Sequence, residues 1–184
     1  MATLDDNFIE PSEVSLWPTA LRYGGIAAVI LIAMALVMHL TGMVDYAAQG
    51  GGSYAWISSI LKYVIWTAAL VMAIKYHRDN ELGGFISFGR GFGVAFVTSL
   101  VIGLLSGIYT FLFFSFIAPE ALDVMYEAAI ENMPEDQAEA AGGMMEMMMS
   151  PIAMIFYSLF EAIFGGGIAS LIVAAIMKRE RPYA

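Results

Sequence analysis

The sequence predicts an all-α fold, an integral membrane four-helix bundle with an amphipathic helical insert before the last span. Three observations support this prediction. Of the 184 residues, 60% are hydrophobic, whereas ordinary globular chains are about 45–50% apolar. The excess is concentrated in four stretches that each reach the roughly 20 apolar residues needed to cross a bilayer. The chain between the third and fourth stretches is acidic and amphipathic instead.

The four predicted spans are rich in Leu, Ile, Val, Ala, Phe and Met. In lipid every backbone N–H and C=O group must be paired within the protein, so spans of this length are expected to be helices. We expect one membrane domain over residues 20–184, with residues 118–150 as the helical insert. The spans cover residues 20–43, 54–75, 91–117 and 151–177.

Charge and cysteine content exclude several classes of protein. Residues 1–19 form a polar N-terminal arm with acidic side chains where a signal peptide would carry positive charge, so no signal peptide is expected. The chain has no cysteine, which excludes disulfides and thiolate-bound zinc or iron–sulfur clusters. The net charge of −9 argues against a nucleic-acid partner, because phosphate binding needs clustered Lys and Arg.

Basic residues predict the orientation of the chain in the membrane. Of the eight, seven lie at the ends of the spans or beyond them on one side, and Lys62 alone lies well inside a span. Because cytoplasmic loops are enriched in Lys and Arg, both termini and the loop 76–90 are expected in the cytoplasm, with residues 44–53 and 118–150 outside. The seven residues on the cytoplasmic side are Arg22, Lys75, Arg78, Arg90, Lys178, Arg179 and Arg181.

Aromatic side chains of the spans fall into two groups. We expect Tyr54, Trp56 and Tyr109 at the membrane interfaces, where amphipathic rings are favoured. Trp66 lies midway along the second span and is expected to be buried between helices.

Small residues recur every four positions in the third and fourth spans. Residues four apart share one helix face, and small side chains allow the close backbone approach that drives helix association in lipid. We therefore expect these two spans to pack along their small-residue columns, although small residues are also common in membrane helices generally. The columns are Gly91, Ala95, Ser99, Gly103 and Gly107, and Ser158, Ala162, Gly166, Ser170 and Ala174.

Glu161, Lys62 and His39 lie inside the predicted spans, away from their cytoplasmic ends, and form a candidate intramembrane polar cluster. Glu161 is ~15 Å from the outer end of its span and Lys62 is ~9–12 Å from the same side. A bare carboxylate at such depth is costly, so a pairing of the two is expected, and His39 in the outer part of the first span can join them. The alternatives are a lysine that extends to the interface alone, a proton or ion relay, and a polar contact with another subunit.

The outward insert offers a second, weaker set of candidates. Asp123, Glu127 and Glu131 stack on one helical face, which is either a solvated acidic face or a site for a divalent cation or a basic partner. The run "MMEMMM" at 144–149 raises the alternative of Cu(I) bound by thioethers, but methionine is also a common filler of adaptable apolar surfaces. No metal ligand set is assigned, and no cofactor is expected.

No arrangement of nucleophile and base appears in the sequence. The two histidines, His39 and His77, are expected at opposite membrane faces and cannot share a catalytic site. The chain is therefore predicted not to be an enzyme.

Several segments resemble one known family. "LRYGGIAA" opens the first span, "KYHRDNELGGFISFGRGFGVAF" leads into the third, "IYTFLFFSFIAPEALDVMYEAAIENM" leads out of it, and "ASLIVAAIMKRE" closes the fourth. Together they resemble the bacterial membrane-protein family known as domain of unknown function 4199, over nearly the whole chain. The resemblance implies a four-span protein of the bacterial inner membrane with an outward helical insert, and it implies no activity.

These observations predict a small non-enzymatic inner-membrane protein that acts as an accessory or scaffold subunit. Its expected partners are the lipid bilayer and another membrane protein or a second copy of itself. The alternative is a small ion or solute transporter or channel centred on Glu161, Lys62 and His39. A water-filled path to Glu161 favours the alternative, whereas a dry and filled bundle favours the subunit.

Overall fold

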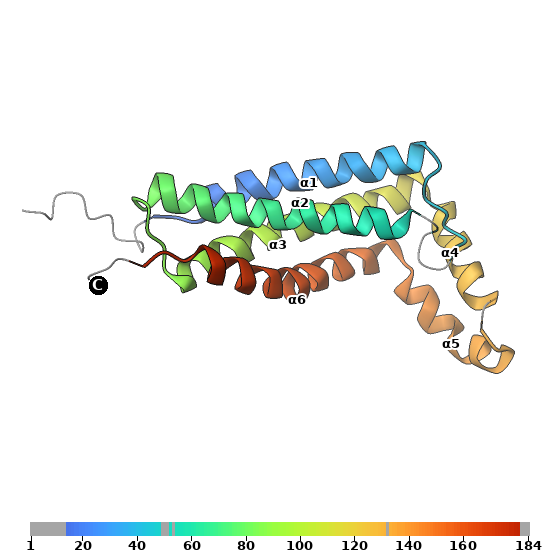
Figure 1. Ribbon diagram of the computed structural model, residues 1–184. Helices are drawn as coiled ribbons and strands as arrows, with labels where there is room; N and C mark the ends of the chain where they lie inside the picture. The colour runs from blue at the N-terminus through green and yellow to red at the C-terminus, as the bar shows by residue number, and fades with distance from the viewer. Residues whose placement is uncertain (1–13, 49–51, 53, 132, 181–184) are drawn as a thin grey trace, which may run out of the picture. The chain divides into compact units, whose positions relative to one another are not determined.

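The computed structural model describes residues 14–48, 52, 54–131 and 133–180 (Figure 1). The described residues are helical apart from short connections and one isolated antiparallel bridge between Ile86 and Arg179. The all-α prediction is confirmed. In chain order the elements are α1 (Trp17–Leu40), α2 (Ala55–Tyr76), the π-helical turn η2 (His77–Glu81), α3 (Phe88–Leu112), the π-helical turn η3 (Phe113–Ile117), α4 (Glu120–Glu131), α5 (Glu135–Met148) and α6 (Pro151–Met177).

Four of these helices are long and apolar enough to cross a membrane. They are α1 with 24 residues, α2 continued by η2 with 27, α3 continued by η3 with 30, and α6 with 27. At 1.5 Å per residue each exceeds the roughly 30 Å of a bilayer's hydrocarbon core. Only 22–33% of the residues in their apolar windows are buried inside the protein. Most of the apolar surface therefore faces outward, where lipid can cover it.

The first helix is displaced from its predicted bounds of 20–43. It begins at Trp17 because Pro18 is tolerated in the first helical turn, where its missing N–H would be unpaired anyway. It ends at Leu40 because Gly42 adopts a left-handed φ of 68°, which stops helices. The Thr41 hydroxyl also donates to the carbonyl of Val37 at 2.7 Å and closes the last turn.

The second helix extends beyond the predicted boundary at residue 75. Residues 77–81 were expected in a cytoplasmic loop but continue the helix as η2. Side-chain contacts with distant segments hold this turn, since Glu81 accepts hydrogen bonds from Thr19 at 3.0 Å and Arg90 donates to His77 at 3.0 Å. Left-handed Gly83 and Gly84, with φ of 67° and 92°, follow the turn.

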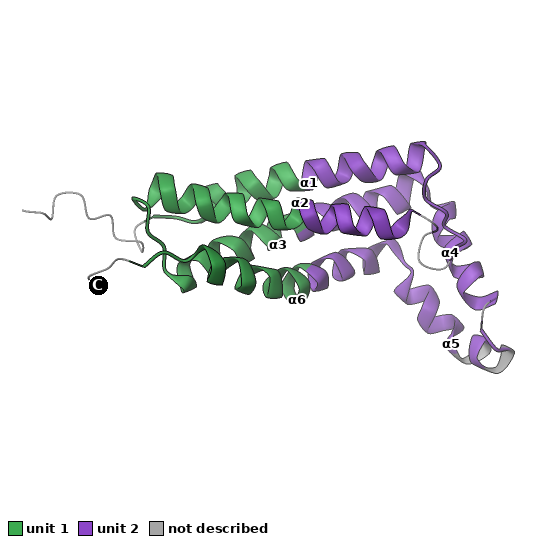
Figure 2. Cartoon of the chain, viewed as in Figure 1, with its two compact units in different colours: residues 1–27, 66–102, 162–184 green, residues 28–65, 103–161 purple. Residues whose placement is uncertain are grey.

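The chain divides into two compact units (Figure 2). Unit 1 contains residues 1–27, 66–102 and 162–184, and unit 2 contains residues 28–65 and 103–161. Each of the four long helices contributes a segment to both units, and α4 and α5 belong to unit 2.

Unit 1 is packed through small residues that let helices approach closely. Ser99 of α3 accepts a hydrogen bond from the Trp66 indole N–H at 3.2 Å and donates to the carbonyl of Ala162 at 3.0 Å. A Cβ atom placed on Gly166 would lie 2.9 Å from the Cβ of Ser99, so no larger residue fits there without a shift. Trp66 is 5% exposed, as predicted.

Unit 2 contains a further contact between α3 and α6 and an aromatic core. A Cβ on Gly107 would lie 3.2 Å from the Cβ of Ser158. Phe113, Ala118 and Ala121 form a buried cluster that joins the end of α3 to the start of α4. Of the ten column residues in the two units, nine are buried and Ser158 is partly buried.

Candidate functional site

The structure brings Lys62 and Glu161 together in unit 2. Lys62 is the eighth residue of α2 and Glu161 the eleventh of α6, and the lysine Nζ lies 2.5 Å from the glutamate Oε1. The Tyr63 hydroxyl donates to the same oxygen at 2.9 Å. The lysine Nζ also lies 4.8 Å from the centre of the Tyr63 ring, which adds a cation–π contact.

This ion pair is incompletely covered. Each of the two side chains is 32% exposed, and Oε2 of Glu161 has no hydrogen-bond partner among the described residues. The residues next to the pair in sequence include the exposed side chains of Tyr63 and Phe160. The pair therefore interrupts a lipid-compatible surface and leaves one carboxylate oxygen available.

His39 lies apart from this pair, in an aromatic cluster of unit 2. Its Nδ1 is 3.1 Å from the hydroxyl of Tyr46, and its ring meets Phe113 edge-on with centroids 4.9 Å apart. Burial, and secondarily the nearby Glu120 carboxylate, raises the pKa of Tyr46. The tyrosine hydroxyl therefore stays protonated, and its O–H group can donate a hydrogen bond to His39.

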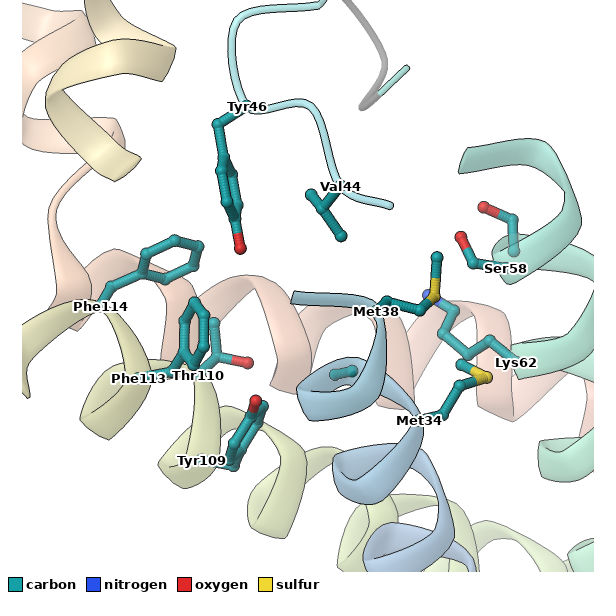
Figure 3. A pocket seen from close by; sticks show the side chains of 12 residues that line it. Met34, Met38, Val44, Tyr46, Ser58, Lys62, Tyr109, Thr110, Phe113 and Phe114 are labelled. Carbon is teal, nitrogen blue, oxygen red and sulfur yellow. The ribbon is translucent and has the colours of Figure 1, made fainter. Parts of the chain in front are cut away.

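A cavity of about 350 Å³ lies in unit 2 beside Lys62 (Figure 3). Its walls come from the last turns of α1, the first turns of α2, the end of α3 with η3, and the segment after α1. The aromatic cluster around His39 contributes Tyr46 and Phe113, so the cavity lies between that cluster and Lys62. The lining residues are Met34, Ala35, Met38, Val44, Tyr46, Ser58, Ser59, Lys62, Tyr109, Thr110, Phe113 and Phe114.

Tyr109 presents an unused hydroxyl at this cavity. Its oxygen is buried and has no hydrogen-bond partner among the described residues, and Figure 3 shows it directed into the same space as the hydroxyl of Tyr46. The expectation that Tyr109 anchors the membrane interface is therefore wrong, because the hydroxyl of an interface anchor lies in the hydrated headgroup layer. The sequence does not predict this inward position of the Tyr109 hydroxyl, because the position depends on how α3 is rotated about its axis.

A second polar cluster lies in unit 1 and was also missed. His77 is fully buried, its Nδ1 is bonded to Glu81, and its Nε2 accepts a hydrogen bond from Arg90 at 3.0 Å. Because arginine can only donate, Nε2 carries no proton in this arrangement and the ring proton sits on Nδ1. Glu81 also accepts from Thr19, and Arg90 also donates to the carbonyl of Val14.

The acidic residues of the insert lie where the sequence places them, on the exposed face of α4. Asp123, Glu127 and Glu131 are all exposed. In the described parts of the chain, no group of three or more His, Asp or Glu side chains is arranged to hold a metal ion. Met144 and Met147 of the methionine run are exposed on α5.

Comparison with protein-family models gives a match over most of the chain. The family model described as "Protein of unknown function (DUF4199)" covers residues 22–179. No curated protein and no solved structure matches the chain. The match extends from the first long helix to the end of the fourth and includes the insert. The chain belongs to the DUF4199 family.

Proposed function

We propose that the protein is a non-enzymatic accessory or scaffold subunit of a membrane assembly in the bacterial inner membrane. The observation that supports this proposal best is the half-satisfied ion pair of Lys62 and Glu161. It lies ~10–15 Å along its helices, each side chain is 32% exposed, and one carboxylate oxygen has no partner in the described chain.

Lipid is a poor covering for such a pair. A charged group facing hydrocarbon is costly, so intramembrane carboxylates usually pair or face a protein interior. A neighbouring transmembrane helix that presents a hydroxyl, amide or ammonium donor would satisfy Oε2 of Glu161 and exclude lipid from the pair. The partner is either another membrane protein or a second copy of this chain.

Photo-crosslinking in intact membranes tests the proposal. Tyr157 lies four residues before Glu161, on the same face of α6. Phe156 lies at almost the same depth as Tyr157 but points about 140° away from the direction of Glu161. Both are exposed aromatic residues, with 44% and 67% of their surface accessible. We expect p-benzoylphenylalanine at Tyr157 to give a discrete protein adduct that Glu161→Gln weakens, and at Phe156 to give none. Adducts with lipid alone at Tyr157, or equal adducts at both positions, would reject the subunit proposal.

The distribution of charge supports cytoplasmic termini. Every described basic residue except Lys62 belongs to unit 1, and every described acidic residue of the insert belongs to unit 2. Because cytoplasmic segments are enriched in Lys and Arg, unit 1 is proposed to face the cytoplasm. The chain has no native cysteine, so Ser87→Cys and Ala138→Cys can be probed singly with an impermeant thiol reagent on spheroplasts. Labelling of position 138 alone is expected, and labelling of position 87 would reverse the orientation.

The second candidate is a small ion or solute transporter, and the cavity beside Lys62 is the observation that favours it. His39 reaches this cavity only through its contacts with Tyr46 and Phe113. Liposomes that contain the purified protein are expected to show no pH- or voltage-driven flux above empty liposomes. A flux that Glu161→Gln abolishes would replace the subunit proposal with the transporter.

A further inference from the structure

We propose that the cavity of unit 2 binds a neutral, planar, quinone-like molecule, with Tyr109 and Lys62 as hydrogen-bond donors to its carbonyl oxygens. Nothing in the family match assigns a ligand to this protein. The inference goes beyond the subunit role, because the cavity and the open oxygen of Glu161 are different features.

The size of the cavity limits the ligand. A volume of about 350 Å³ is at the lower end of the roughly 300–1,000 Å³ typical of small-molecule pockets. Such a space holds one or two rings with short substituents and excludes a whole two-chain lipid. The ring system is therefore the part that the cavity recognises, and a longer apolar tail would have to extend outside it.

The walls favour a flat aromatic ring. Phe113 and Phe114 both line the cavity, and their rings meet at 83° with centroids 5.2 Å apart (Figure 3). Met34 and Met38 line the cavity from α1, and thioether sulfur makes favourable contacts with aromatic rings while adapting to their shape.

Most polar groups at the cavity are already used within the protein. Ser58 and Ser59 donate to the carbonyl of Ala55 at 2.9 and 2.8 Å, and Thr110 donates to the carbonyl of Ser106 at 2.8 Å. The hydroxyl of Tyr109 is the exception, since it is buried and has no hydrogen-bond partner in the part of the chain that the structure describes. A buried hydroxyl without a partner is unfavourable, and a ligand with an acceptor oxygen removes that cost.

Charge decides between a neutral and an anionic ligand. Lys62 uses one of its three donors on Glu161, which leaves donors for a second acceptor. The pair is neutral as a whole, so an anion in the cavity would be attracted by the lysine and repelled by the carboxylate. A neutral carbonyl oxygen accepts a hydrogen bond from Nζ without displacing Glu161.

The test uses the full-length chain in lipid nanodiscs and three probes that share one ring system. We expect 2-methyl-1,4-naphthoquinone to bind saturably, with one site per chain, above protein-free nanodiscs in equilibrium dialysis. The hydrocarbon 2-methylnaphthalene and the anion 2-naphthoate are each expected to bind at least ten-fold more weakly. Quinone binding no greater than in protein-free discs, or equal binding of the hydrocarbon, would overturn the proposal. Tighter binding of the carboxylate would overturn the assignment to a neutral ligand.

Two variants locate the binding site. Tyr109→Phe removes only the hydroxyl and is expected to weaken quinone binding about five-fold, since one hydrogen bond contributes about 1 kcal/mol and 1.4 kcal/mol is a factor of ten. Ala35→Leu fills the cavity and is expected to abolish saturable binding. Ala33→Leu is the matched control, because Ala33 is exposed on the same helix and does not line the cavity. Wild-type affinity in Tyr109→Phe, or equal losses in Ala35→Leu and Ala33→Leu, would show that the probe binds elsewhere.

Discussion

The two polar clusters of the molecule differ in how completely their hydrogen bonds are satisfied. In unit 1, both ring nitrogens of His77 are bonded, and Glu81 accepts from His77 and Thr19. In unit 2, one oxygen of Glu161 accepts from both Lys62 and Tyr63, while the other oxygen has no partner in the described chain.

This difference in hydrogen bonding distinguishes a cluster that only stabilises the fold from a site that can still bind another molecule. A buried polar network that is fully satisfied makes the local fold rigid and leaves no group for a ligand. The cluster around His77 fits that description, because it ties α1, η2 and α3 together with His77 fully buried. The pair of Lys62 and Glu161 is partly exposed and also borders the cavity. The remaining N–H donors of Lys62 and the second oxygen of Glu161 can therefore form hydrogen bonds with another molecule.

The largest expected loss of stability comes from removing Glu81 from the hydrogen-bonded cluster around His77. Glu81→Leu leaves the His77 ring N–H and the Thr19 hydroxyl without their shared acceptor, and each buried unpaired group costs about 1–3 kcal/mol. We expect the free energy of unfolding in detergent to fall by about 3 kcal/mol. The matched control is Glu180→Leu, whose carboxylate is exposed and lies 3.7 Å from Lys178, and it should change stability by less than about 0.5 kcal/mol. Equal effects of the two variants would show that the cluster contributes no stability.

The next largest difference in stability is expected between substitutions at the small-residue contacts of the two units. Gly166→Ala places a Cβ 2.9 Å from the Cβ of Ser99 and also against its hydroxyl, which is held by Trp66 and Ala162. Gly107→Ala places a Cβ 3.2 Å from the Cβ of Ser158 and 3.3 Å from the backbone Cα of Ile155, so a shift of a few tenths of an ångström between the two segments relieves it. Overpacking costs about 1–3 kcal/mol, whereas replacing helical glycine by alanine gains about 1 kcal/mol.

We therefore expect Gly166→Ala to lower stability by about 2 kcal/mol and Gly107→Ala to be nearly neutral. Chemical unfolding followed by tryptophan fluorescence measures both, and the Trp66 signal should change only in the Gly166 variant. Ala175→Ser, on the exposed face of α6, serves as a control for substitution in that helix. The reverse order of the two glycine variants would mean that the contact around Ser99 adapts more easily than the contact around Ser158.

The sequence predicts some of these features well and others not at all. Apolar length is a local property, so the four long helices could be predicted, with errors only at their ends. The proximity of Lys62 and Glu161 could be expected because depth along a helix follows from residue number. The cluster around His77 and the cavity could not be predicted, because each joins segments far apart in sequence and depends on helix rotation. Nothing in the local pattern indicates that Tyr109 turns inward.

Substitutions in the ion pair of Lys62 and Glu161 should lower stability less than the substitution of Glu81 in the cluster around His77. Removing one member of a fully buried pair costs about 3–5 kcal/mol, but solvent or detergent at one-third exposed side chains reduces this to about 1–2 kcal/mol. Lys62→Met is expected to be milder than Glu161→Leu, because the orphaned glutamate can become neutral by taking up a proton. The double variant should recover most of the loss, and thermal unfolding in detergent measures all three. Strictly additive single effects would mean that the two side chains are not coupled.

The smallest expected effect compares two tyrosines of unit 2, one whose hydroxyl donates a hydrogen bond and one whose hydroxyl has no partner among the described residues. Tyr63→Phe removes a hydrogen bond to the Glu161 carboxylate and should destabilise the protein by about 1 kcal/mol. Tyr109→Phe removes a buried hydroxyl that no described residue bonds, so it should leave stability unchanged or raise it by about 0.5 kcal/mol. Thermal unfolding of the two variants in the same detergent, without added quinone, measures the difference. A clear loss of stability in Tyr109→Phe would mean that its hydroxyl is already satisfied, by water in the cavity for example. The cavity would then be hydrated at its polar end, and a ligand would have to displace that water before it could bond to Tyr109.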